Sequence, residues 1–248
     1  MTHGDPKRGG RHGDDGLKIG REGLDPVFTF IDNATAQKKP FFIWWNTTRM
    51  HVWTRLAPKW EGKSGYGLYA DGMMEHDYHV GQLLDEVDKL GIADNTIVIY
   101  STDNGSQTNT YPDGGSEPFR GEKGSTWEGG HRVPGIISWP AKIKENRNEQ
   151  TPISTLDILP TIFKITGVAL PKERTIDGRD IRSILMPEKH KNKLDEFKFF
   201  YSYSDNQPSA IRKDAWKLHV RIGSQTENDY GFTASKKTPL LFQVEKDL

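Results

Sequence analysis

The chain has 248 residues, enough for one large α/β domain or for one domain with a small appendage. Its 34 basic and 34 acidic residues balance, so the composition supports neither a nucleic-acid partner nor an anionic membrane surface. The absence of cysteine excludes disulfides, zinc–thiolate sites and a cysteine nucleophile within these residues. No apolar run approaches the roughly 20 residues that span a bilayer, and the polar first ten residues do not resemble a signal peptide.

The first part of the chain predicts a loop, a helix and a strand. Residues 1–24 are rich in Gly, Arg, His and Asp without periodicity, which indicates a loop or a disordered lead-in. Residues 27–37 carry apolar side chains at the spacing of one helix face. Residues 41–45, Phe-Phe-Ile-Trp-Trp, form a wholly apolar run that is typical of a buried parallel strand.

A long helix and two further strands follow. Asp71 is a plausible N-cap for a helix that ends near residue 90, where Gly91 supplies the stop. The β-branched residues of 96–100 predict the next strand, and residues 135–139 predict a third. A strand, a helix and a strand in this order imply a right-handed crossover and therefore a parallel sheet.

The second half of the chain changes character at Pro171. Before it, residues 151–167 predict a helix. After it, the segments 197–203, 210–220 and 240–244 look like strands without helices long enough to cross between them, which predicts a small antiparallel sheet. In the helix predicted over residues 151–167, we expect these side chains to be buried: Leu156, Leu159, Ile162, Phe163 and Ile165.

Polar residues follow two of the predicted core strands. Residues 46–51 come after the first strand, and Asp103 and Asn104 come after the second. Ligands of parallel α/β sheets bind beyond the carboxyl ends of the strands, and carboxylate and amide oxygens suit Ca²⁺ or Mg²⁺. The alternative is a hairpin turn at Asn104-Gly105. A hairpin needs a second apolar run downstream, and residues 106–115 do not provide one.

Two cationic candidates accompany this strand tip. Lys123 lies in a glycine-rich loop that lets a ligand approach the backbone closely, and its compact charge suits one oxygen of a tetrahedral anion. His51 follows the first strand, where a purely structural role is the alternative.

His76 and His79 stand three apart on the predicted helix and could form a metal pair. Their position near the apolar face favours a structural role.

Three segments in this order, 46–51, 102–105 and 120–134, resemble the sulfatase family of the alkaline phosphatase superfamily. The resemblance extends over most of the chain. It implies an α/β fold with a partial alkaline-phosphatase-like sandwich core over 25–170. A linker and a small C-terminal antiparallel subdomain would occupy 171–248.

The resemblance also implies a role for each candidate. Asp103 and Asn104 would form half of a calcium site, with magnesium as the alternative ion. Lys123 would hold the sulfate oxygens, and His51 would contact the sulfate and protonate the leaving alcohol. Hydrolysis of a sulfate ester builds up negative charge on these oxygens, so a cation, a lysine and an acid stabilise it where it develops. The substrate would be a small-molecule or carbohydrate sulfate ester, and the compartment periplasmic or secreted.

The family's nucleophile has no clear counterpart in this chain. Sulfatases of this type use a formylglycine made from Cys or Ser in a C/S-x-P-x-R motif. They also use two further metal aspartates and a lysine–histidine pair. All of these precede the counterpart of His51, and the residues before His51 contain none of them. Ser116 matches S-x-P-x-R, but it follows the Asp103 tip and lacks the expected apolar continuation, so it is disfavoured.

We therefore expect a C-terminal portion of an arylsulfatase-type hydrolase that is inactive alone. Two alternatives remain open at this point. One is a phosphodiesterase or phosphonate hydrolase of the same superfamily. The other is a non-catalytic fragment that binds anions or a partner.

Overall fold

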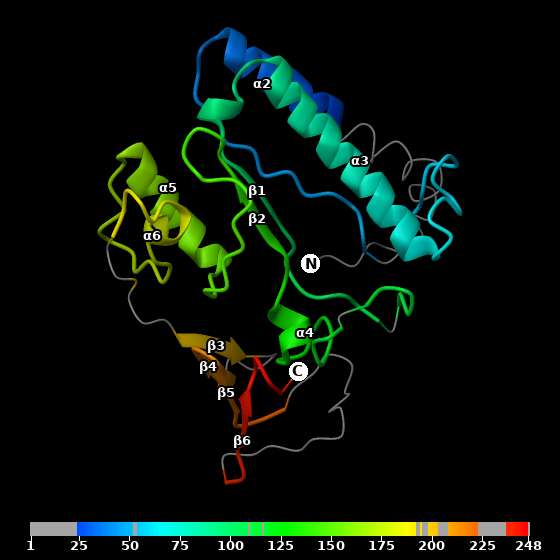
Figure 1. Ribbon diagram of the computed structural model, residues 1–248, viewed down its shortest axis with the longest axis vertical. Coiled ribbons are helices and arrows are strands. Elements are labelled where there is room, and N and C mark those ends of the chain that lie inside the picture. The colour runs from blue at the N-terminus through cyan, green and yellow to red at the C-terminus, as the bar shows by residue number, and fades with distance from the viewer. Residues whose placement is uncertain are drawn as a thin grey trace. The chain divides into compact units, whose positions relative to one another are not determined.

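The computed structural model describes residues 24–51, 54–108, 110–115, 117–191, 194, 198–202, 208–222 and 237–247 (Figure 1). Nearly all of the expected lead-in, and also Ser116, lie outside these ranges. The chain forms two compact units. The helical unit comprises Met1–Thr96 and Ser106–Glu117, and the sheet unit comprises Ile97–Gly105 and Pro118–Leu248. The predicted boundary near residue 170 stays a prediction.

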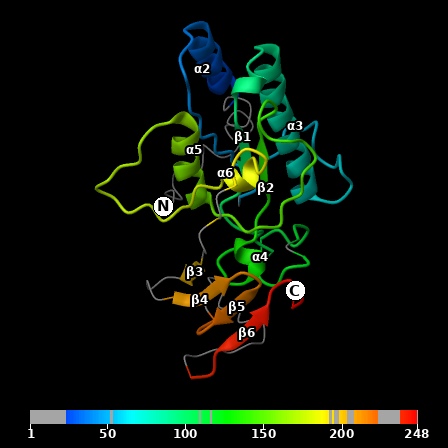
Figure 2. The same cartoon turned by 60° about the vertical axis from the view of Figure 1, so that its left-hand side comes forward.

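In its described residues the helical unit contains the helices α2 (Leu24–Ala36) and α3 (Leu68–Lys89), which lie side by side (Figures 1 and 2). Leu24 and Ile31 of α2 and Val87 of α3 are buried. The first predicted helix is confirmed, with an earlier start. The short 3₁₀ helix η2 (Ala93–Asn95) follows α3.

The prediction of Asp71 as the N-cap of α3 is wrong, because the helix begins at Leu68 and its N-cap is Gly67. The Asp71 carboxylate is buried and accepts hydrogen bonds from the backbone N–H groups of Gly62 and Ser64, each at 2.7 Å. Asp71 therefore closes the preceding loop onto the helix instead of capping it.

The predicted strand at 41–45 is also wrong, since these residues belong to no sheet in the described part of the chain. Their side chains alternate between half-buried and exposed, as they do in a strand. Phe42 and Trp44 are 77% and 80% exposed. The apolar pattern thus predicted an extended segment whose side chains alternate in exposure, but a strand also needs a hydrogen-bonded neighbour.

In the sheet unit, β1 (Val98–Ser101) pairs with β2 (Gly135–Ser138), which confirms both predicted strands. Their pairing is antiparallel. The parallel sheet predicted from the crossover between 41–45 and 96–100 is not formed among the described residues, because 41–45 pairs with no strand. The chain returns to β2 through a loop and a short helix, α4 (Glu128–His131), rather than through a long crossover helix. Ile99 stands opposite Ile137 on one face of the pair.

Helix α5 (Ile158–Thr166) lies against that face, where Ile162 and Ile165 line the same narrow apolar gap as Ile99 and Ile137. It follows the 3₁₀ helix η3 (Thr155–Asp157) and ends at Gly167, whose φ is 74°.

The expected buried stripe of α5 is wrong at two positions, because Leu156 and Leu159 are 54% and 46% exposed. The helix also starts later than residue 151, since Ser154 and Asp157 form a capping box there. Two polar residues of this segment, Asp157 of η3 and Thr161 of α5, are buried beside the apolar face that carries Ile162 and Ile165.

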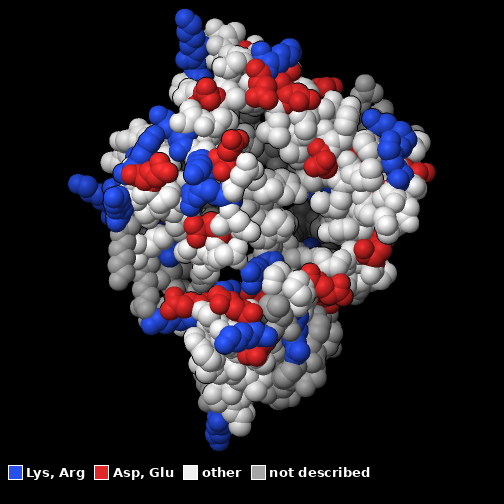
Figure 3. Space-filling model, viewed as in Figure 1, with Lys and Arg blue, Asp and Glu red and all other residues white. Residues whose placement is uncertain are grey.

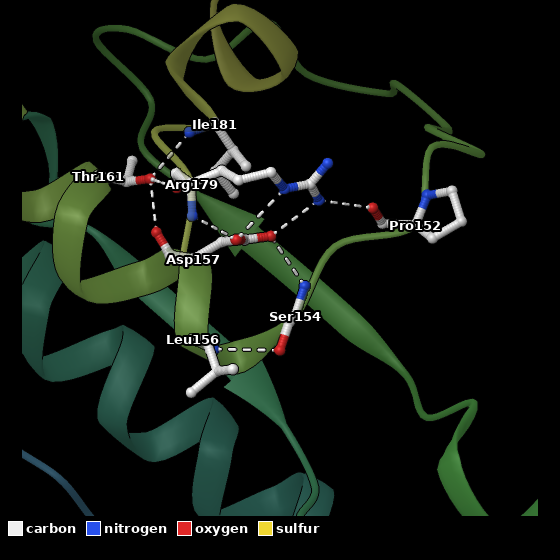
Figure 4. A network of polar contacts seen from close by, with 7 residues as sticks. All are labelled: Pro152, Ser154, Leu156, Asp157, Thr161, Arg179 and Ile181. Carbon is white, nitrogen blue, oxygen red and sulfur yellow. Dashed lines mark hydrogen bonds and ion pairs between the residues drawn. The ribbon is translucent and has the colours of Figure 1, made fainter. Parts of the chain in front are cut away.

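Asp157 is the centre of the polar network in Figure 4. Its carboxylate is fully buried and accepts hydrogen bonds from the backbone N–H groups of Ser154 at 3.0 Å and Arg179 at 2.7 Å. The Arg179 guanidinium lies 3.1 Å from the same carboxylate. Thr161 donates to the Asp157 carbonyl at 2.6 Å and accepts from the Ile181 N–H at 3.0 Å. The network ties the segment before α6 (Arg182–Leu185) to the start of α5.

The predicted C-terminal antiparallel sheet is confirmed. Within the described residues its strands run in the order β3-β4-β5-β6, all antiparallel (Figure 2). The predicted segment 210–220 is a hairpin of two strands, because the chain turns at Asp214, where φ is 52°. The strands are β3 (Lys198–Ser202), β4 (Pro208–Lys213), β5 (Trp216–His219) and β6 (Leu240–Gln243).

Charged side chains of both signs are interspersed on the face shown in Figure 3, in keeping with the balanced composition. Among the described residues, no helix combines the length and the apolar character needed to cross a bilayer.

We expect Asp157→Asn to lower the free energy of unfolding by about 3 kcal/mol, because it removes the charge of a fully buried carboxylate that pairs with the largely buried Arg179 guanidinium. The matched control is Asp180→Asn, which removes a more exposed ion pair with Arg182 and should cost less than about 1 kcal/mol. Urea unfolding followed by circular dichroism measures both. Equal losses in the two variants would contradict the role assigned to Asp157.

Candidate functional site

The first part of the site is the end of β1. Asp103 is exposed and Asn104 is half-buried just beyond the strand. The Thr102 hydroxyl lies 3.4 Å from the Asp103 carboxylate and 3.3 Å from the Asn104 carbonyl. Gly105 then donates its N–H to the carbonyl of Gly130 at 3.1 Å. The two oxygen-bearing side chains thus stand at a strand tip that is fixed from behind by α4.

Lys123 lies in a tight turn from Glu122 to Ser125. The Glu122 carbonyl accepts from the Ser125 N–H at 3.0 Å and from its hydroxyl at 2.7 Å. The Ser125 hydroxyl in turn accepts from the Glu122 N–H at 3.2 Å. Gly121 and Gly124 have φ values of 84° and 79°, which glycine adopts without strain. Glu122 and Ser125 are buried, whereas Lys123 between them is half-buried.

Glycine backbones join the strand tip and the Lys123 turn. The N–H of Gly129 in α4 donates to the Arg120 carbonyl at 2.7 Å. A Cβ atom on Gly105 would stand 1.7 Å from the Gly129 oxygen, and one on Gly129 would stand 2.2 Å from the Gly121 oxygen. We call residues 103–105 and 120–131 the glycine cassette. The structure therefore carries Asp103, Asn104 and Lys123 on one tightly packed assembly.

We expect Gly105→Ala to lower the free energy of unfolding of the sheet unit by about 2 kcal/mol, because the new methyl group forces the backbones of the cassette apart. Gly135→Ala at the start of β2 is the control, since its Cβ would meet no atom within 4 Å. Thermal melts report the stability, and amide NMR shifts of the cassette report its geometry. A melting temperature of Gly105→Ala that equals the melting temperature of Gly135→Ala would contradict this packing.

His51 belongs to the helical unit and its side chain is exposed. Its carbonyl accepts hydrogen bonds from the Thr54 N–H at 3.2 Å, from the Thr54 hydroxyl at 2.7 Å and from the Tyr111 hydroxyl. Two residues earlier, the buried Arg49 guanidinium pairs with Glu75 at 2.8 Å. The backbone of His51 is therefore well anchored. Its convergence with Asp103, Asn104 and Lys123 of the sheet unit stays a prediction.

The described residues contain no group of three or more His, Asp or Glu side chains that could hold a metal ion. This finding includes the surroundings of His76 and His79, whose pKa values are both lowered mainly by burial. Ca²⁺ takes six to eight oxygen ligands. Asp103 and Asn104 have the right donor chemistry, and their exposed and half-buried places allow access, so they fit as part of such a shell.

Glu128, at the start of α4, is a residue of the site that the sequence did not predict. Its carboxylate lies 2.6 Å from the Arg212 guanidinium of β4 and 3.0 Å from the Lys217 ammonium of β5. All three side chains are largely buried. Burial lowers the pKa of Lys217 to about 8, although the Glu128 carboxylate opposes the shift. The partners lie more than eighty residues downstream, and no local pattern reveals such a pairing.

His219 lies beside this ion triad and is fully buried. Its ring packs against Trp127, with 4.5 Å between the ring centroids, and neither ring nitrogen has a hydrogen-bond partner. Burial and the neighbouring Lys217 charge lower the pKa of His219 to about 3. The imidazole is therefore neutral at neutral pH and packs as an aromatic ring.

This burial predicts a loss of stability in acid. The unfolded histidine titrates near pH 6.5, whereas the folded one titrates at about 3, so the unfolded state alone binds the proton between these values. The stabilising contribution is complete above about pH 6.5 and falls as the pH drops below it. We expect His219→Phe to flatten the decline in urea midpoint between about pH 7 and about pH 5. An unchanged slope would contradict the buried neutral state.

Comparison with known proteins assigns the family. The family model described as "Sulfatase" matches residues 21–168, more than half of the chain. A second model, "N-sulphoglucosamine sulphohydrolase, C-terminal", matches residues 122–243. The chain belongs to the sulfatase family. The predicted resemblance is confirmed, and both the glycine cassette and the C-terminal sheet fall within the matched regions.

Individual sulfatases agree with this assignment. The rat (Rattus norvegicus) steryl-sulfatase is 36% identical over 186 residues, which cover 73% of this chain and 31% of that protein. The arylsulfatase of Hemicentrotus pulcherrimus is 30% identical over 226 residues, which cover 88% of this chain and 40% of that protein. The crystal structure of the PsFucS1 sulfatase from Pseudoalteromonas sp. matches with a TM-score of 0.79 and 29% identity. That match covers 90% of this chain and 46% of the other.

Three conclusions follow for this sulfatase chain. The predicted α/β, alkaline-phosphatase-like class is confirmed, and the small sheets of the structure are consistent with a partial core. The chain spans well under half the length of the two relatives compared above. Sulfatases generally bind a divalent metal ion, and two hard oxygen donors of the cassette suit one.

Proposed function

We propose that this chain forms part of an arylsulfatase-type sulfuric ester hydrolase. The reaction is cleavage of a sulfate ester into an alcohol or phenol and inorganic sulfate. The observation that carries the proposal is the glycine cassette, which holds Asp103, Asn104 and Lys123 together inside the region matched by the family. The substrate is a small-molecule or carbohydrate sulfate ester, and the compartment is periplasmic or secreted.

Each candidate residue has a distinct task in this proposal. Asp103 and Asn104 offer a carboxylate and an amide oxygen to a calcium ion, with magnesium as the alternative. The bound ion would supply positive charge to the sulfate oxygens. Lys123 places a compact ammonium against one of those oxygens, where negative charge develops during cleavage. His51 donates a proton to the oxygen of the departing alcohol.

The chain as it stands is expected to be inactive. Its described residues contain no group of three or more His, Asp or Glu side chains that could hold an ion with six to eight ligands, and its sequence lacks a convincing nucleophile motif before His51. We expect negligible hydrolysis of an aryl sulfate at saturating calcium. Hydrolysis that is abolished by Lys123→Ala would overturn this expectation, because it would show that these residues suffice.

Anion binding tests the cassette without requiring turnover. A ¹⁵N-labelled chain is titrated with sulfate in the presence of calcium, and the amide shifts of residues 121–125 are followed. We expect saturable shifts that Lys123→Ala removes, since the ammonium supplies the attractive charge. Lys63→Ala, in the helical unit, is the control and should leave the shifts in place. Absence of sulfate-dependent shifts in the unchanged chain would contradict the proposed function, and stronger binding of phosphate would favour a phosphoester substrate.

A further inference from the structure

Helix α4 is packed into the cassette through its two glycines. The Gly130 carbonyl accepts a hydrogen bond from the Gly105 N–H, and the Gly129 N–H donates a hydrogen bond to the Arg120 carbonyl. A Cβ on Gly130 would lie 2.4 Å from the Ser125 oxygen and 2.7 Å from the Glu122 oxygen. Any displacement of α4 therefore displaces both the strand tip and the Lys123 turn.

The residue before these glycines fastens α4 to the C-terminal sheet. Glu128 places one carboxylate oxygen against Arg212 and the other against Lys217, on adjacent strands of that sheet. Arg212 also donates to the Asp214 carbonyl at 2.9 Å, which fixes its guanidinium at the β4–β5 turn. The carboxylate is thus held from two directions.

We propose that Glu128 is a positioning residue for the anion site, which it holds in register by anchoring the glycine cassette to Arg212 and Lys217. This inference rests on the proposed function of Asp103, Asn104 and Lys123. Glu128 itself touches neither substrate nor metal in the proposal. It acts through the backbone of Gly129 and Gly130, so its effect on the site is geometric.

The charges show why a carboxylate is needed at this position. Arg212 and Lys217 are buried cations that both pair with Glu128, and removal of its charge takes away the carboxylate that compensates them. The cations then repel each other and draw in water, and α4 loses its tether. Glu128→Gln is the sharpest probe, because it keeps the size and shape of the side chain while it removes the charge and replaces one acceptor oxygen by an NH2 donor.

The experiment is the sulfate titration of the complete ¹⁵N-labelled chain, repeated with Glu128→Gln. We expect the amide resonances of Gly105, Gly121 and Gly124 to move before sulfate is added, and the sulfate dissociation constant to rise about tenfold. Asp157→Asn is the matched control, because it also neutralises a buried carboxylate of the sheet unit but has no contact with the cassette among its hydrogen bonds. It should lower stability and leave sulfate affinity within about twofold.

Lys217→Met provides a second variant that is easier to fold, since Glu128 keeps Arg212 as its partner. Its sulfate affinity should fall between those of the unchanged chain and Glu128→Gln. If Glu128→Gln does not fold, the sulfate affinity of Lys217→Met tests the positioning role of Glu128 in its place. Sulfate affinity that is unchanged in the folded variants, or lowered equally by Asp157→Asn, would overturn the inference while leaving the proposed function intact. An unchanged chain that binds no sulfate would instead remove the proposed function and the inference together.

Discussion

The candidate site depends on the close approach of Gly105 to Gly129. No side chain fits between them, since a Cβ on Gly105 would overlap the Gly129 oxygen at 1.7 Å. The approach lets the Gly105 N–H reach the Gly130 carbonyl, and it lets α4 sit between the strand tip and the Lys123 turn. The backbones that carry Asp103, Asn104 and Lys123 are thus held at fixed positions by backbone contacts, which are stiffer than contacts between long side chains.

Buried carboxylates hold the sheet unit together around this cassette. Asp157 fixes the start of α5 to the segment at Arg179, and Glu128 fixes α4 to the C-terminal sheet. Such pairs contribute little net stability compared with apolar packing, but breaking one of them is costly because a charge is left buried. In a chain with a hydrophobic fraction of only 34%, these pairs define where its short elements meet.

The sequence allowed good prediction wherever the signal is local. The β-branched run of β1, the C-terminal strands and the glycine that ends α5 are examples, because each depends on a few consecutive residues. Pairing was predicted poorly. Residues 41–45 alternate like a strand without a partner, and β2 returns antiparallel to β1, since neither outcome is encoded in the segment itself.

The site shows the same division between local and distant information. Asp103, Asn104 and Lys123 were identified from short motifs, and their packing into one cassette follows from the glycines beside them. The role of Glu128 could not be predicted, because its partners Arg212 and Lys217 come from strands far along the chain. The predicted buried stripe of residues 151–167 was wrong at Leu156 and Leu159 for a related reason: Asp157 and Thr161 are fixed by contacts with Arg179 and Ile181, which lie about twenty residues downstream.

A crystal structure of this chain grown with calcium and sulfate would test the glycine cassette most directly as an anion and metal site. We expect a sulfate oxygen within about 3 Å of the Lys123 ammonium nitrogen. We also expect a cation on the Asp103 and Asn104 oxygens, with the Gly105–Gly129 approach preserved. A well-ordered sheet unit in which Lys123 points away from the strand tip, and sulfate and calcium bind elsewhere, would contradict that assignment.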